Sequence, residues 1–189
     1  MKIYFDLCID GFTNSYTILN DDPNVMEAII IDPGKFSNEI INRIEKGGYK
    51  LTSVLLTHNH AHHTHGLKTL SKIYTPTVYA AESSVYEYES VVLNGDGMTT
   101  ISGLHVEYFS IPGHSPDSMV YKIEDVIFTG DTLLAGMISK TSHKYSEKLL
   151  SSKIREKLYA LPDRTVIMPG HGVPSTIESE KQYNLDILL

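Results

Sequence analysis

Histidines gather in the middle of the chain, directly after a short apolar run over residues 51–56. Five of the nine histidines lie within eight residues, namely His58, His60, His62, His63 and His65. Purification tags and low-complexity tracts also concentrate histidines, but tags stand at chain ends and this run follows a predicted strand. Because neutral imidazole binds zinc, iron, copper and nickel, the run predicts a metal site at the end of a strand.

The spacing within the run indicates which histidines share one side. In an extended segment alternate side chains point the same way, so His58 and His60 are expected to face one metal together. The chain is then expected to turn into a helix, where the adjacent His62 and His63 diverge. One of these two is expected to reach a second metal or the shared cavity.

Three later segments each place a metal-ligand residue beside glycine or proline at the end of an apolar run. They are residues 111–116 with His114, residues 128–133 with Asp131 and residues 168–172 with His171. Glycine lets the backbone turn sharply and approach a site closely. A single Gly-His or Gly-Asp-Thr is usually only a turn or a helix cap, but the ordered set predicts further ligands for the same metal centre.

Apolar periodicity predicts an α/β protein in which strands come in clusters with helices between them. Strands are expected over residues 2–8, 14–19, 26–31, 51–56, 77–80, 104–111, 118–123, 125–129 and 165–168. Helices are expected from the N-cap Ser37 to Gly47-Gly48 and over residues 64–74, 82–88, 147–160 and 176–184. This pattern fits two sheets packed face to face with helices outside, in a single domain over residues 1–189.

Charge and composition narrow the partners. The formal net charge of −7 argues against nucleic acid, whose phosphates require a basic face. The one cysteine, Cys8, excludes a disulfide within the chain and is expected to be a buried apolar residue in a reducing compartment. No signal peptide and no run of the ~20 apolar residues that span a bilayer are recognisable, so a cytoplasmic protein without a membrane partner is predicted.

Taken in order, these segments resemble the signatures of the metallo-β-lactamase fold superfamily. Residues 57–63 are similar to its first signature, usually His-x-His-x-Asp-His, and the three later segments are similar to the remaining ones. Residues 130–136, and residues 169–172 followed by 176–184, resemble the glyoxalase II-like hydrolases in particular. The resemblance implies a four-layer αββα sandwich with a two-metal site at one edge.

The resemblance also implies a role for each ligand residue. His58, His60 and His114 would hold the first metal, His63 and His171 the second, and Asp131 would bridge both. The implied cofactors are two divalent ions, zinc first, with iron and manganese as alternatives. A metal-bound hydroxide would be the nucleophile, since a bound divalent ion lowers the pKa of water to about 7.

One position departs from the signature, because His62 stands where the family has Asp. Asp131 and His62 are the implied catalytic positions, since the family's Asp ligates the second metal and orients the water. The imidazole of His62 either ligates the second metal or points away and leaves that site weak or empty. His65 is an alternative substitute for the family's Asp. Its other expected role is to support a ligand by a hydrogen bond or to face solvent. Thr57 and Ser115 flank ligands and are expected to hydrogen-bond them.

The predicted function is a metal-dependent, glyoxalase II-like hydrolase of a thioester, ester or related small molecule. Long glyoxalase II enzymes carry a C-terminal helical domain that helps bind glutathione, and the resemblance does not extend to it. Two alternatives stay open. One is a di-iron redox or oxygen-binding protein akin to the flavodiiron branch, which normally has Glu where this chain has His60. The other is a non-catalytic metal sensor. The oligomeric state is open.

Overall fold

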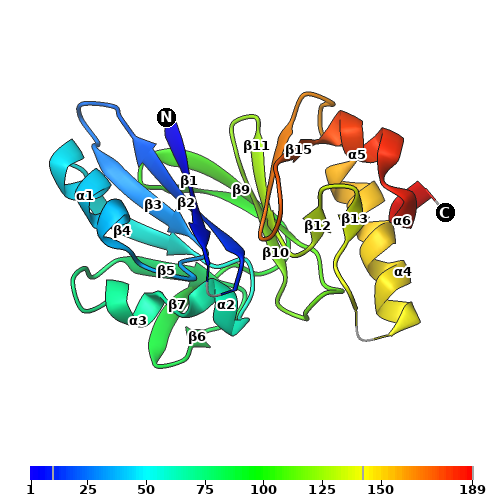
Figure 1. Ribbon diagram of the computed structural model, residues 1–189, viewed down its shortest axis with the longest axis horizontal. Helices are drawn as coiled ribbons and strands as arrows, with labels where there is room; N and C mark the ends of the chain where they lie inside the picture. Colours follow the sequence, from blue (N-terminus) through cyan, green and yellow to red (C-terminus); the bar gives the residue numbers. More distant parts are fainter. Residues whose placement is uncertain (10, 142, 189) are drawn as a thin grey trace.

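The computed structural model describes residues 1–9, 11–141 and 143–188. Two β-sheets form the centre of the molecule (Figure 1). The first has the order β1-β2-β3-β4-β5-β7-β6, with β1 (Lys2–Cys8), β2 (Thr13–Asn20), β3 (Glu27–Ile31), β4 (Lys50–Leu55), β5 (Thr77–Ala80), β6 (Ser84–Val85) and β7 (Tyr88–Val92). The second has the order β15-β14-β11-β10-β9-β8, with β8 (Gly97–Ile101), β9 (Leu104–Ser110), β10 (Met119–Ile123), β11 (Val126–Gly130), β14 (Val166–Pro169) and β15 (Ser175–Thr176). A small hairpin joins β12 (Leu133–Leu134) to β13 (Met137–Ile138).

Helices cover the outer face of each sheet (Figure 1). The first sheet carries α1 (Asn38–Gly47), α2 (Ala61–Thr64) and α3 (Leu67–Leu70). The second carries α4 (Lys144–Lys153), which continues as the π-helical turn η1 (Ile154–Leu158), and then α5 (Ile177–Tyr183) and α6 (Leu185–Leu188). The arrangement is the predicted four-layer αββα sandwich.

Three buried apolar clusters separate the four layers. In β3, Ala28 and Ile30 pack toward α1 and α3, whereas Ile29 and Ile31 pack between the two sheets. Period-two alternation puts successive side chains on opposite faces, so an all-apolar strand is buried on both sides. The third cluster fills the space between the second sheet and its helices and includes Ile127 of β11.

The ends of α1 agree with the sequence prediction. Ser37 caps the helix by accepting a hydrogen bond from the Ile40 amide at 3.4 Å. Gly48, at φ 72°, ends it in the left-handed conformation that glycine adopts without a steric penalty. Ile40 and Ile44 are buried against the sheet.

Two helix predictions were wrong. Residues 82–88, expected to be helical, instead form the β6–β7 hairpin, whose turn holds Tyr86 at φ 52°. The expected helix over residues 64–74 is divided into α2 and α3 at Gly66. The Gly66 amide donates to the Pro33 carbonyl at 2.7 Å. The helix is interrupted at this residue, where the two backbones come close together. Strands β7 and β8 were not predicted.

The loops that follow two pairs of parallel strands lie close together. β3 is parallel to β4, and β11 is parallel to β14, so the carboxyl ends within each pair lie together. Asp32, Thr57, Asp131 and Gly170 follow these four strands within two residues. Loops at the carboxyl ends of parallel strands are frequent locations of binding sites in α/β proteins. Within the described residues, no helix has the length and apolar character needed to cross a membrane.

Candidate metal centre

Six of the seven predicted ligand residues converge at one edge of the sandwich. Two overlapping groups have all their ligand atoms within 4.8 Å of one another, His58 with His60 and His114, and His58 with His63 and Asp131. The carboxylate of Asp131 lies between the others. Its oxygens are 4.0 Å from His58 Nε2, 3.5 Å from His63 Nε2, 3.6 Å from His114 Nε2 and 3.5 Å from His171 Nε2.

The centre has a closed side and an open side. His58, His63 and Asp131 are buried, whereas His60 is exposed and His114 and His171 are partly exposed. The open side is therefore the one that a molecule from solution can reach.

Hydrogen bonds fix the orientation of four of these imidazoles. In each, Nδ1 faces an oxygen, which is Thr57 Oγ1 for His58 (3.1 Å), Asp32 for His63 (2.9 Å), the Lys140 carbonyl for His114 (3.2 Å) and the Phe12 carbonyl for His171 (3.0 Å). These acceptors assign a proton to Nδ1 and direct Nε2 of each ring at the centre. Ligating histidines commonly show this arrangement.

The buried carboxylate of Asp32 organises two of these ligands, and sequence reasoning missed it. It accepts hydrogen bonds from the Thr57 amide at 2.8 Å, from Thr57 Oγ1 at 2.6 Å and from His63 Nδ1 at 2.9 Å. Because Thr57 Oγ1 donates to Asp32, it accepts from His58 Nδ1. The available signal was an acid directly after the apolar strand 26–31, the same pattern that singled out Asp131. Thr57 hydrogen-bonds a converging histidine, His58, as expected, whereas Ser115 hydrogen-bonds with Ser118.

Close backbone approaches explain the glycines beside the ligands. A Cβ atom on Gly130, which has φ 50°, would lie 2.3 Å from Thr57 Oγ1. A Cβ on Gly170 would lie 2.5 Å from Asp131 Oδ1. Both contacts are shorter than van der Waals separation, so the loops carrying Asp131 and His171 reach the centre only with glycine at these positions.

The first sheet holds the His171 loop in place. The Asn14 side chain donates to the carbonyls of Pro169 and Gly172, each at 2.9 Å, and Tyr16 Oη donates to Pro169 at 2.7 Å. The Asn14 amide also donates to the Gly170 carbonyl at 2.7 Å. A ligand from near the end of the chain is thus positioned by a strand near its beginning.

The donor set fits divalent metal ions. His60 Nδ1 lies 2.9 Å from His58 Nε2 and 3.1 Å from His114 Nε2, and a single proton on His60 satisfies only one of these lone pairs. Within the described residues, the buried atoms His63 Nε2 and Asp131 Oδ1 make no hydrogen bond. Buried polar atoms ordinarily have partners, and a cation would supply one here. Tetrahedral zinc places its ligand atoms roughly 3.3 Å apart, close to these separations.

Electrostatics at the centre favour a positive charge beside His63. Burial, reinforced by the nearby His63, lowers the pKa of His58 to about 3, so its imidazole is neutral. Burial acts to lower the pKa of His63, but the carboxylates of Asp32 and Asp131 outweigh it and raise the pKa to about 10. Burial acts to raise the pKa of Asp131, but His63 outweighs it and lowers the pKa to about 2. Two carboxylates that stabilise a protonated imidazole also stabilise a metal cation in the same place.

The seventh predicted ligand, His62, does not join this centre. It belongs to neither group of converging ligand atoms, among the residues described. Its exposed ring lies against Gly11, where an added Cβ would be 2.7 Å from His62 Nδ1. Adjacent residues of a helix point about 100° apart, and in α2 it is His63 that points inward to Asp32. His65 is exposed, consistent with contact with solvent.

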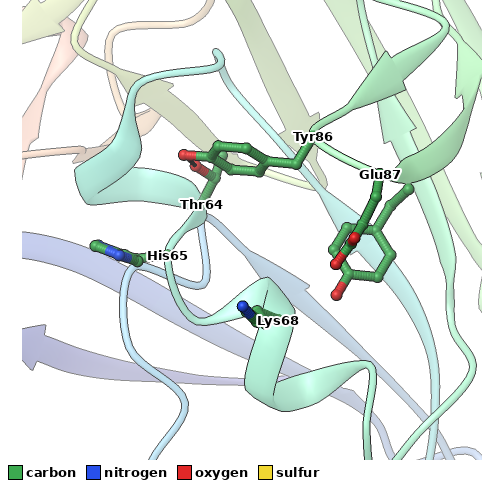
Figure 2. A pocket seen from close by; sticks show the side chains of 6 residues that line it. Thr64, His65, Lys68, Tyr86 and Glu87 are labelled. Atoms are coloured by element: carbon green, nitrogen blue, oxygen red, sulfur yellow. Dashed lines mark hydrogen bonds between the residues drawn. The ribbon is translucent and has the colours of Figure 1, made fainter.

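A pocket of about 310 Å³ lies between the short helices α2 and α3 and the β6–β7 hairpin. None of the six converging residues lines it. Figure 2 shows Tyr86 over Thr64, while His65 projects away from Glu87. Thr64 Oγ1 lies 3.2 Å from the Tyr86 hydroxyl and 3.1 Å from the His60 carbonyl. The hairpin β6–β7 thus braces the short helix that carries His63.

The family model described as the metallo-beta-lactamase superfamily matches residues 8–171, which includes all six converging residues. The chain belongs to the metallo-beta-lactamase superfamily. The superfamily fold, together with the two overlapping groups of ligand atoms, indicates a binuclear metal site.

Relatives of this superfamily member carry hydrolase names. It is 30% identical over 166 residues to a hydroxyacylglutathione hydrolase of Chromohalobacter salexigens, covering 86% of this chain and 64% of that protein. It is also 30% identical over 195 residues to the probable metallo-hydrolase YqgX of Bacillus subtilis, covering 90% of each chain. Among solved structures, the BLEG-1 B3 metallo-beta-lactamase matches with a TM-score of 0.84 and 26% identity, over 98% of this chain and 99% of that one.

Proposed function

We propose that this superfamily member is a metal-dependent hydrolase of a thioester, ester or related small-molecule carbonyl compound. The observation that carries the proposal is a pair of buried ligand atoms, His63 Nε2 and Asp131 Oδ1, that make no hydrogen bond among the described residues and face each other at 3.5 Å inside a ring of oriented imidazoles. Relatives named as hydrolases support the reaction class.

In this proposal the six converging residues divide between two ions. His58, His60 and His114 would hold the first, His63 and His171 would hold the second, and Asp131 would be shared by both. Bound divalent ions supply a nucleophile by lowering the pKa of water, and they polarise a carbonyl oxygen. Zinc suits this nitrogen-rich donor set, with iron and manganese as alternatives.

The protein's own residues prepare the site for that chemistry. Hydrogen bonds from Nδ1 atoms hold four imidazoles in one orientation, so no ligand has to reorganise when a substrate arrives. The buried side, formed by His58, His63 and Asp32, excludes bulk water. The partly exposed side at His60, His114 and His171 admits the substrate.

Hydrolysis by zinc-loaded protein is the direct test. We expect at least one member of a panel of thioesters, carboxylic esters and lactones to be cleaved with a turnover number of roughly 1 to 1000 per second. The control is the same preparation after a chelator has removed the metal, which should lose the activity and regain it with zinc. Cleavage no faster than the chelated control across the whole panel would contradict the proposal.

The relatives guide the composition of that panel. The chain spans 64% of the length of the hydroxyacylglutathione hydrolase of Chromohalobacter salexigens, so that protein's activity does not transfer as a whole. The panel therefore pairs each hydroxyacyl thioester of glutathione with the same acyl group on a smaller thiol. Equal cleavage of both members of a pair assigns recognition to the acyl group.

Metal binding at His63 should release a proton. Because the pKa of His63 is raised to about 10, its imidazole is protonated at pH 8 and must lose the Nε2 proton to bind an ion. The ion that binds there should release about one proton per chain, and its affinity should rise with pH up to about pH 10. Calorimetric titration in two buffers with different protonation enthalpies measures the release. His65→Ala, outside the centre, should release the same number, and zero release would contradict the assignment.

A second candidate function, di-iron redox or oxygen chemistry, is favoured by the nitrogen-rich donor set of five imidazoles and one carboxylate. Loading with iron without oxygen, followed by exposure to oxygen, distinguishes it from hydrolysis. An iron-dependent absorbance change together with an inactive zinc form would favour this candidate.

A further inference from the structure

The side chain of His62 lies in a different environment from the other histidines of the cluster. It lines a pocket of about 320 Å³ that also includes Cys8, Gly11, Lys35 and His65, and that contains none of the six converging residues. The backbone of His62 is also closely packed. A Cβ on Gly34 would lie 2.1 Å from the His62 carbonyl oxygen. The backbone of α2 is therefore held on this side, and the His62 ring lies in a pocket beside the centre.

The neighbouring residue explains this placement. His63 directs Nδ1 to the buried Asp32 at 2.9 Å and Nε2 toward Asp131 at 3.5 Å, so it is held from both sides. His63 therefore occupies the inward position of α2, and the imidazole of His62 lies outside the groups of converging ligand atoms. The ring of His62 then packs on Gly11, where no side chain obstructs it.

The two proposed metal sites consequently have unequal donor sets. The first has three imidazole nitrogens, His58 Nε2, His60 Nδ1 and His114 Nε2, with Asp131 Oδ2 beside them. Four protein donors are the number that a tetrahedral zinc ion would take. The second has His63 Nε2, His171 Nε2 and the shared carboxylate of Asp131. It has one protein donor fewer and no carboxylate of its own.

We propose that His62 is not a metal ligand and that the second site, formed by His63, Asp131 and His171, binds its ion far more weakly than the first. This inference rests on the proposed metal centre. The single carboxylate is shared between two dications, and their mutual repulsion acts mainly on the ion with fewer donors. The chain is therefore a stepwise binder, with one firmly held ion and one that exchanges.

Zinc titration of stripped protein in competition with a chromophoric chelator tests the inference, with elemental analysis of the metal retained after dialysis. For the natural sequence we expect one retained ion and a second dissociation constant on the order of a hundredfold weaker than the first. His62→Ala should leave both dissociation constants within about threefold, because no ligand is removed. His62→Asp removes the ring that packs on Gly11 and offers a short carboxylate next to His63, so it should tighten the second site by about a hundredfold and retain two ions.

A matched control separates ligation from general charge. His65→Asp adds the same carboxylate three residues further along, at another exposed position that lines the same pocket. It should tighten the second site by less than about tenfold, because a carboxylate there acts only through screened charge. Circular dichroism confirms that each variant is folded before its titration is interpreted.

Three results would overturn the inference. They are two ions of equal affinity in the natural sequence, loss of the second ion in His62→Ala, and no gain in His62→Asp. A folded natural protein that binds no zinc would instead refute the metal centre itself. Unequal sites without hydrolysis of any substrate would refute the proposed hydrolase and leave this inference standing.

Discussion

Replacing Asp131 by Asn should reduce metal-dependent hydrolysis by at least roughly a thousandfold, because this carboxylate contacts four of the converging imidazoles. Asparagine keeps the size of the side chain and removes its charge. The shared negative charge between the two ions is lost, and the second ion loses its only anionic donor. The measurement is kcat/KM on the cleaved substrate, with zinc retention determined on the same samples.

The matched control is Asp163→Asn, which removes an exposed carboxylate paired with Lys181 on the surface. It should leave kcat/KM within about twofold, since exposed ion pairs contribute little. If Asp131→Asn retained more than a tenth of the activity with a full complement of zinc, Asp131 would not be the shared ligand.

Replacing Asp32 by Ala should lower both stability and metal affinity, although Asp32 does not itself face the converging ligand atoms. Three donors, the Thr57 amide, Thr57 Oγ1 and His63 Nδ1, would lose their buried acceptor. We expect the free energy of unfolding to fall by about 3 kcal/mol, and zinc affinity to fall by roughly 10- to 100-fold as His58 and His63 lose their orientation. Denaturant unfolding in the presence of a chelator measures the first effect separately from the second.

Asp125→Ala provides the comparison, because Asp125 is an exposed carboxylate paired with Arg164. Its effect on unfolding should stay within about 0.5 kcal/mol. A further variant, Asp32→Asn, retains an acceptor for Thr57 but offers its amide group in place of the second oxygen. An unchanged zinc affinity in both Asp32 variants would show that the imidazoles are oriented by packing alone.

Much of the candidate centre was predictable because the converging residues carry local signals. His58 and His60 alternate in an extended segment, and His114, Asp131 and His171 each stand beside a glycine at a strand end. The glycines at 130 and 170 are needed where two loops approach within a side chain's width of their neighbours. Such patterns can be recognised in the sequence because they depend on the backbone geometry of a few neighbouring residues.

The fate of His62 could not be predicted in the same way. The sequence left it either as a ligand or as a residue that points away, and the choice depends on which of two adjacent imidazoles meets Asp32. That carboxylate comes from a strand end about 30 residues earlier (His63 and Asp32 are separated by 31 positions). The β6–β7 hairpin was missed for a similar reason, since β7 pairs with the distant strand β5 and β6, among the residues described, pairs only with β7, so neither strand depends on its own periodicity.

The converging ligands also divide evenly between the two halves of the sandwich. His58, His60 and His63 follow β4 of the first sheet, whereas His114, Asp131 and His171 belong to loops of the second. A bound ion is therefore a cross-link between the halves, in a chain whose one cysteine cannot form an internal disulfide. Since such an ion binds the folded chain in preference to the unfolded one, its binding free energy adds to the free energy of unfolding. An ion bound for the proposed hydrolysis would therefore also stabilise the folded chain.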